Sequence, residues 1–154
     1  MTDPNSRLAS GRLASAHVRA AEDAWNRRDI DAVVLSHRID CHWRAGTEFL
    51  WGREQVRAFL DRKRRREIDS RVIHQLWAFS DVRFAVRTVC EFRTDSGTWF
   101  RGYGDESWEC DASGLLGRRF SSVNEHPIGE HERLLRWPTG ARPVDGPSLE
   151  DLGL

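Results

Sequence analysis

The sequence has few cysteines, and they cannot all pair with one another. Among its 154 residues there are three, Cys41, Cys90 and Cys110, and none lies in a CxxC motif. Each falls in a strand-like stretch, where a free cysteine behaves as a small buried hydrophobic residue. We therefore expect no disulfide and a reducing, cytoplasmic location.

Long apolar runs and an excess of charge of one sign are also absent. No stretch approaches the roughly 20 apolar residues that span a bilayer, and the polar segment Met1 to Ser10 lacks the apolar centre of a signal peptide. The formal net charge is +0, which argues against a nucleic-acid partner held by bulk electrostatics. We expect no membrane and no nucleic-acid partner.

Three common catalytic motifs are missing. The sequence contains no GxGxxG, no GxxxxGK[ST] and no GxSxG. Dinucleotide redox chemistry, nucleotide hydrolysis and serine-hydrolase chemistry therefore have no support, and we expect no cofactor.

The composition is that of a globular protein: 39% of the residues are hydrophobic and 31% are charged. The length predicts a single domain over residues 1–154, with a polar lead-in over 1–11 and an extended C-terminal arm over 137–154. The arm carries Pro138, Gly140, Pro143, Gly146 and Pro147, so it can be neither helix nor central strand. Because it ends in leucines, we expect it to lie over its own domain or a partner's.

Hydrophobic periodicity predicts helices first and strands afterwards. A helical pattern begins at Arg12, Asp29 is suited to cap a second short helix, and a third opens at Gly52-Arg53. A short strand, Cys41–Arg44, interrupts them. Period-two alternation then predicts four more strands, over 71–79, 82–93, 99–110 and 118–123. This order predicts an α+β fold, with helices packed on one face of an antiparallel meander.

Several segments resemble one family over nearly the whole chain. They are AEDAWNRRD (21–29), TEFLWGRE (47–54), FLDRK (59–63), LWAF (76–79), AVR (85–87), WFRGYGDESWE (99–109) and RWPTGARP (136–143), with a terminal LGL. The chain resembles the nuclear-transport-factor-2-like, SnoaL-like superfamily, and within it the bacterial domain of unknown function 1348 family. The resemblance implies a cone-shaped, curved antiparallel sheet with three N-terminal helices on its concave face, enclosing a pocket, and a homodimer. It implies no reaction, because a fold does not fix a function.

The hairpin of the second and third strands of the meander supplies the candidate site. With the turn centred on Asp95-Ser96, Arg93 pairs with Thr98 and Ala85 opposes Glu106. This register places Arg87 and Glu91 on one face with Glu106 and Trp108.

Two glutamates and five further side chains are the resulting candidates. Glu106 and Glu91 are the candidate catalytic acid or base, if burial raises their pKa. The candidate ligand-binding residues are Arg87, which could hold an anionic group bidentately, and Arg44, Trp43, Trp108 and Glu48. The alternative is that Arg87 and the glutamates form a structural ion pair.

Two further features are expected to carry no chemistry. Ketosteroid isomerase, also in this superfamily, has a general base and a tyrosine whose places fall here at about Trp43 and Ala21, so we expect no isomerase of that type. His126 and His131 lie among glutamates but match no metal-binding motif, so we expect an exposed polar loop and no metal.

Two hypotheses remain open. One is a small-molecule-binding protein that acts as a cofactor-independent acid/base enzyme, of lyase, isomerase or cyclase type, on a small anionic organic substrate. The other is a non-catalytic ligand-binding or dimerisation module. Gly102 and Gly104 are expected to leave room beside Glu106: room there favours a ligand, and a bulky tail residue in it favours the second hypothesis.

Overall fold

The structure, a computed structural model, describes residues 3–154. Three α-helices, six strands and one 3₁₀ helix follow in the order α1 (Pro4–Asn26), α2 (Ile30–Leu35), β1 (His37–Ala45), β2 (Glu48–Trp51), α3 (Gly52–Arg66), β3 (Ile68–Ser80), β4 (Arg83–Arg93), β5 (Trp99–Cys110), β6 (Leu116–Ile128) and η1 (Glu130–Glu132). Within this range no helix is long and apolar enough to cross a membrane.

The first helix is longer than its hydrophobic pattern predicted. It begins at Pro4 rather than at Arg12, a position that suits proline because the first turn leaves its N–H groups unpaired anyway. The predicted polar lead-in over 1–11 is therefore wrong from Pro4 onward, and its first two residues lie outside the described range. The starts of the next two helices are as expected: Asp29 caps α2 by accepting a hydrogen bond from the Ala32 N–H, and α3 begins at Gly52.

The six strands form one sheet in the order β2-β1-β6-β5-β4-β3. The meander β3–β6 is antiparallel, as predicted, but β1 pairs with β6 in parallel, so the expectation of a wholly antiparallel sheet is wrong at that one junction. The short strand β2 and the length of β6, which continues through His126 to Ile128, were not predicted either.

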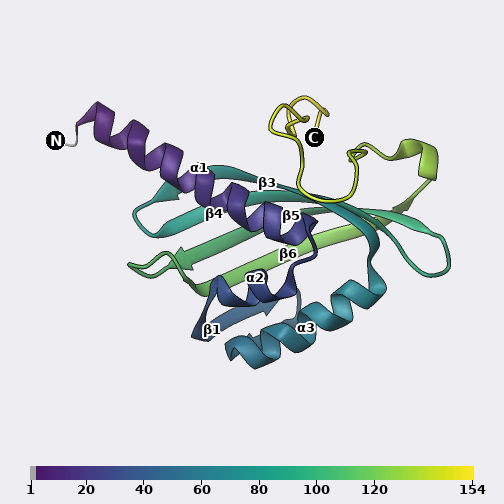
Figure 1. Cartoon of the computed structure of the whole chain (residues 1–154), viewed down its shortest axis with the longest axis horizontal. Helices are drawn as coiled ribbons and strands as arrows, with labels where there is room; N and C mark the ends of the chain where they lie inside the picture. Colours follow the sequence, from purple (N-terminus) through teal and green to yellow (C-terminus); the bar gives the residue numbers. More distant parts are fainter. Residues whose placement is uncertain (1–2) are drawn as a thin grey trace.

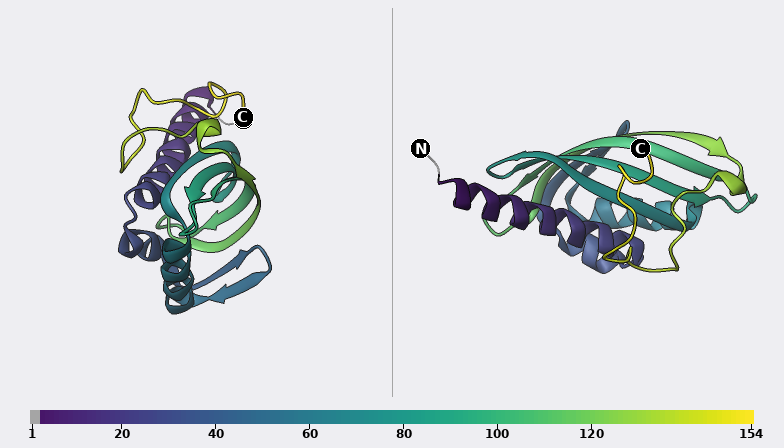
Figure 2. Two further views of the ribbon diagram at one scale, coloured as in Figure 1. Left: turned by 90° about the vertical axis from the view of Figure 1, so that its right-hand side faces the viewer. Right: turned by 90° about the horizontal axis from the view of Figure 1, so that it is seen from above.

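The sheet curls into an open trough and the three helices lie along its concave side (Figures 1 and 2). Helix α1 runs beside the edge strand β3. Asn26 exchanges two hydrogen bonds with the backbone of Val72, and Glu22 accepts one from the His74 N–H. These polar side chains satisfy outward-facing groups of an edge strand that would otherwise be unpaired.

The hairpin between β4 and β5 has a different register from the predicted one. Arg93 pairs with Trp99, so Val86 lies opposite Glu106 and Arg87 opposite Asp105. The loop has one residue more than assumed, because Gly97 adopts a φ of 86° and its N–H returns to the Thr94 carbonyl. Since side chains alternate between faces, this shift of one residue separates Glu106 from Arg87 and Glu91.

The chain after η1, residues 133–154, includes the predicted arm over 137–154 and lies over its own domain, which is one of the two predicted positions (Figure 1). Leu135, Trp137 and Leu149 pack on Ile73 and Val89, on the convex side of β3 and β4. The arm therefore covers part of the face opposite the helices.

Candidate functional site

A pocket of about 400 Å³ lies between the concave face of the sheet and the three helices. This volume is within the range of small-molecule sites. The aromatic and aliphatic residues of its wall are Ala24, Trp25, Ile30, Val33, Trp43, Ala45, Phe59, Leu60, Val72 and Val123.

A buried ion pair between Glu106 and Arg119 lies at the pocket floor. Arg119 comes from β6 and donates from Nε to Glu106 Oε1 at 2.6 Å. The same oxygen also accepts hydrogen bonds from Trp108 Nε1 at 3.0 Å and from Ser121 Oγ at 2.9 Å. Ser121 in turn accepts from Trp43 Nε1, so two tryptophans and a serine fix the carboxylate in one orientation.

The two charged side chains use only part of their hydrogen-bonding capacity. Among residues 3–154, no donor reaches Glu106 Oε2, and no acceptor hydrogen-bonds to the terminal nitrogens of Arg119. These atoms are not among the side-chain atoms that are both fully buried and without a hydrogen-bond partner, and both residues line the pocket. The floor therefore presents unpaired cationic donors and one unpaired anionic acceptor.

Aromatic rings surround the Arg119 guanidinium. Its central carbon lies 4.1 Å from the ring centroid of Trp43, 5.2 Å from that of Trp108 and 5.8 Å from that of Trp25. Cation–π contacts of this kind stabilise the buried guanidinium and fix the orientation of its plane.

Glu106 is ionised at neutral pH. Burial by itself would raise its pKa, but the charge of Arg119 and the hydrogen bonds to Oε1 outweigh burial and lower the pKa to about 2. The candidate role of Glu106 as a catalytic acid or base depended on a pKa raised by burial, and that condition is not met. Glu106 can accept a hydrogen bond or a proton, but at neutral pH it carries no proton and cannot act as a general acid.

His74 is the third polar group of the pocket lining. The residue is only 6% exposed, and its Nδ1 lies 3.0 Å from the Thr88 hydroxyl. Its Nε2 has no partner among the described residues. Burial is the largest cause and, with the charges of Arg119 and Arg142, it outweighs the opposing charge of Glu106 and lowers the pKa of His74 to about 4, so the ring is neutral at pH 7.

The charges around the pocket favour an anion. Its lining includes seven arginines and lysines against five aspartates and glutamates, although the whole chain is neutral. At the rim these charges pair with one another, as in Lys63 with Glu67 and Arg66 with Glu125. Arg119 is the cation whose donors remain available at the floor.

The predicted site residues fall into two groups. Glu106, Trp43 and Glu48 line the pocket, and Trp108 holds Glu106; Glu48 lies at the rim, bound to Arg62. The other predicted residues lie on the convex face. There Arg87 stacks on Trp77, and Arg44 stacks on Phe120.

Glu91 also lies away from the pocket. It is fully buried, and its two oxygens accept hydrogen bonds from Arg101 and from the backbone N–H groups of Leu134 and Leu135. It anchors the C-terminal arm, a structural role of the kind that the ion-pair alternative described, though with Arg101 rather than Arg87.

Gly102 and Gly104 do not provide room for a ligand. A Cβ at Gly102 would meet Cys90 Sγ at 2.8 Å, and one at Gly104 would meet Val123 Cγ2 at 2.7 Å. Side chains of the neighbouring strands fill the space instead, so these glycines serve the packing of the sheet and distinguish neither hypothesis.

Arg119, Ser121 and His74 are site residues that the sequence pattern did not single out. All three point to the concave face from predicted strands, in step with buried neighbours, so alternation could have placed them there.

Within residues 3–154 no cluster of histidine, cysteine, aspartate or glutamate could hold a metal ion. His126 lies on β6 against Tyr103 and not in a loop, which corrects that expectation.

The sequence profile of the family described as "Protein of unknown function (DUF1348)" matches residues 10–136. No curated protein matches the sequence. Several solved structures share the fold. An NTF2-like protein of unknown function from Burkholderia pseudomallei K96243 is 17% identical with a TM-score of 0.65, over 71% of this chain and 88% of that one.

Two further solved structures are similar to a comparable degree. A Mycobacterium tuberculosis protein in complex with estradiol-17beta-hemisuccinate is 16% identical with a TM-score of 0.62, over 71% of this chain and 92% of that one. The epoxide hydrolase/cyclase-like enzyme SalBIII, of pyran ring formation in salinomycin, is 14% identical with a TM-score of 0.61, over 77% of this chain and 92% of that one. At these identities the likeness establishes the NTF2-like fold alone.

Proposed function

The chain belongs to the DUF1348 family, and we propose that its pocket binds a small organic anion whose charged group is held by Arg119. One observation carries the proposal: the side chain of Arg119 is only 3% exposed, yet its terminal nitrogens have no hydrogen-bond partner within residues 3–154. Leaving donors of a buried charge unpaired is costly unless a ligand pairs with them. A planar guanidinium matches a carboxylate or another oxyanion bidentately.

The wall of the pocket fits the organic part of such a ligand. Trp25 and Phe59 add apolar surface to the pocket beside the charged pair. Pockets of this kind bind a ligand mainly by burying its apolar surface, while a few polar groups fix its orientation. NTF2-like neighbours are known with small molecules, including an estradiol hemisuccinate. That ligand, which carries an acid group on an apolar body, is of the kind we propose here.

We further propose that the pocket performs acid/base chemistry without a cofactor, and His74 favours this over binding alone. Its neutral ring keeps one nitrogen unpaired, while Thr88 can accept from Nδ1 or donate to it. When Nδ1–H donates to Thr88, Nε2 is the basic nitrogen. It has almost no exposed surface in this structure, so proton transfer from a ligand requires a movement that opens Nε2 to the pocket, and the nearby Glu106 carboxylate would stabilise the imidazolium that results.

Titration calorimetry with sodium phenylacetate and sodium mandelate tests anion binding. The unmodified protein should bind at least one of the two salts, and the neutral isostere phenylacetamide should bind at least about tenfold more weakly. In Arg119→Lys, which keeps the charge beside Glu106 but loses the planar fork, the affinity should fall about tenfold.

Arg87→Lys is the matched control. It makes the same chemical change on the convex face, where Arg87 stacks on Trp77, and its affinity should stay within about twofold of the unmodified protein. Equal losses in the two variants, or no binding of either salt, would rule out Arg119 as the anchor.

The predicted homodimer and cytoplasmic location also remain proposals. Among the aromatic residues of β4 and β5, Phe92 and Trp99 are buried and cannot contact a second copy, and Tyr103 is 38% exposed. The convex face instead exposes Tyr103 with Phe49, Trp77 and Phe120. We propose that this face joins two copies, which predicts a dimer in sedimentation at micromolar concentration and a monomer in Phe120→Glu.

A further inference from the structure

The hydrogen bonds of Glu106 are distributed unevenly over its two oxygens. Oε1 accepts from three donors, on Arg119, Trp108 and Ser121, at 2.6, 3.0 and 2.9 Å. Oε2 accepts from none of the described residues. A carboxylate oxygen usually has its acceptor sites filled when it is buried, so Oε2 is the acceptor that a ligand would fill.

The unpaired atoms belong to two side chains that are joined by a hydrogen bond. Arg119 Nε and Glu106 Oε1 are 2.6 Å apart, and the unpaired terminal nitrogens and Oε2 are attached to the same two groups. An arginine can only donate hydrogen bonds and an ionised carboxylate can only accept them. The floor therefore presents donors next to an acceptor.

A simple carboxylate matches only half of this arrangement. Its oxygens can pair with Arg119, but they bring negative charge towards Oε2, where nothing compensates it. A second charged group, as in a dicarboxylate or a phosphate dianion, would increase the repulsion. The complementary ligand has an anionic acceptor and a hydroxyl donor on adjacent atoms.

We infer that the pocket is specific for 2-hydroxy carboxylates: the carboxylate pairs with the terminal nitrogens of Arg119 and the hydroxyl donates to Glu106 Oε2. The inference rests on the proposed function, since it requires an anion at Arg119. The substituent on the hydroxyl-bearing carbon lies against Trp25 and Phe59, which line the pocket above the floor.

His74 is the other polar side chain of the pocket lining that has an unpaired atom. It is more than nine-tenths buried, lines the pocket, and leaves Nε2 without a partner in the described part of the chain. Because Nε2 has almost no exposed surface, His74 is not itself a contact point; Arg119, Glu106 and the apolar wall of Trp25 and Phe59 are the three contacts by which the pocket distinguishes the two enantiomers of a chiral 2-hydroxy acid.

The experiment compares mandelate, as separate enantiomers, with phenylacetate, which lacks only the hydroxyl group. Titration calorimetry of the unmodified protein should give at least about tenfold tighter binding of one mandelate enantiomer, a difference of about 1.4 kcal/mol. In Glu106→Gln the acceptor Oε2 is exchanged for an amide, so the preference should narrow to below about threefold, with phenylacetate binding more tightly than before.

The outcomes separate the two claims. If phenylacetate binds as tightly as mandelate, the hydroxyl group is not recognised, and the inference fails while anion binding at Arg119 stands. If neither salt binds, both claims fail. If mandelate is preferred equally in the unmodified protein and in a Glu106→Gln variant whose circular dichroism is unchanged, Glu106 does not accept a hydrogen bond from the hydroxyl and the inference fails.

Discussion

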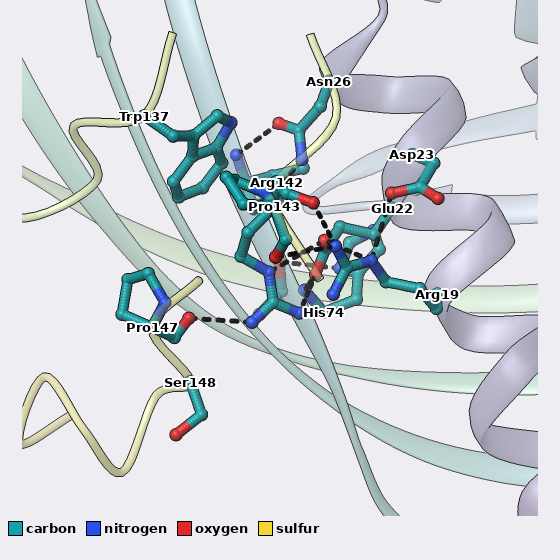
Figure 3. Close-up of polar contacts among 12 residues, drawn as sticks. Arg19, Glu22, Asp23, Asn26, His74, Trp137, Arg142, Pro143, Pro147 and Ser148 are labelled. Atoms are coloured by element: carbon teal, nitrogen blue, oxygen red, sulfur yellow. Dashed lines mark hydrogen bonds and ion pairs between the residues drawn. The ribbon is translucent and has the colours of Figure 1, made fainter. Parts of the chain in front are cut away.

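Arg142 and Glu22 form a buried ion pair that joins the C-terminal arm to the first helix (Figure 3). Arg142 donates from Nε to Oε2 at 3.1 Å and from Nη2 to Oε1 at 2.9 Å, and Oε1 also accepts from the backbone N–H of His74. The side chain of Glu22 is 0% exposed and that of Arg142 is 10% exposed. The arm, α1 and the edge strand β3 therefore meet at a single carboxylate.

Removing one member of this pair should be strongly destabilising. Arg142→Met leaves the buried Glu22 carboxylate without its cation, and we expect the free energy of unfolding to fall by about 3 kcal/mol. The double variant Glu22→Gln with Arg142→Met should lose less than the sum of the two single variants. Denaturant unfolding of all three measures both effects.

The exposed pair of Arg93 with Asp69 is the control for this comparison. Its side chains are 36% and 53% exposed, so Arg93→Met should cost less than about 1 kcal/mol. A loss at Arg142 no larger than the loss at Arg93 would mean that the arm is not fastened through Glu22.

Glu91 should prove structural rather than catalytic. Glu91→Gln places an amide NH₂ among donors from Arg101 and the N–H groups of Leu134 and Leu135, so we expect a loss of about 3 kcal/mol and faster hydrogen exchange at the two leucine amides. Binding of an anion at Arg119 should keep its affinity within about twofold. A large change in affinity, with unchanged stability, would restore Glu91 as a site residue.

The sequence predicted the two faces of each strand better than it predicted their pairing. Alternation correctly grouped Arg87 with Glu91, and Glu106 with Trp108, because side chains of one strand alternate by simple geometry. Combining two strands required the length of the loop, and the extra residue at Gly97 reversed the outcome. The expected placement of Arg87 on the same face as Glu106 is wrong for this reason.

The pocket floor could be predicted only in part. Glu106 and Trp43 were recognised because each is a charged or aromatic residue in a stretch with a clear strand pattern. Arg119 was overlooked because it is one of 24 lysines and arginines, and only the parallel pairing of β1 with β6 brings it over Trp43. Such long-range pairing is not encoded in local periodicity.

The protein should lose stability as the pH falls from 7 to 5. Burial lowers the pKa of both His37 and His74 from 6.5 to about 4. Between these values the unfolded chain binds protons that the folded chain does not, so acidification favours unfolding. Each histidine should contribute roughly 2 kcal/mol between pH 6.5 and 5.

Two other buried groups modify this dependence. Burial raises the pKa of Glu22, which opposes the loss above pH 4.5, whereas Glu106, with a pKa of about 2, adds to the loss only below pH 4.5. Urea unfolding at pH 7, 6 and 5 should therefore show a net fall, and the fall should be smaller in His37→Gln and in His74→Gln. The same substitution at the exposed His131 is the control, and equal slopes in all four proteins would contradict the buried neutral state of the two histidines.

Gly104 is required by the packing of three strands, and replacing it should destabilise the sheet. A Cβ at this position would lie 2.7 Å from Val123 Cγ2, 2.8 Å from Thr88 Cγ2 and 2.9 Å from the Ser122 carbonyl oxygen. Since the last of these is backbone and cannot rotate away, we expect Gly104→Ala to cost about 2–3 kcal/mol.

In α1, by contrast, a Cβ at Gly11 meets Phe79 at an ordinary 3.7 Å, so Gly11→Ala should stabilise the helix by up to about 1 kcal/mol. Thermal unfolding of the two variants measures both effects. Opposite signs are expected, and a Gly104→Ala variant as stable as the unmodified protein would mean that β4, β5 and β6 are not packed so closely that alanine is excluded.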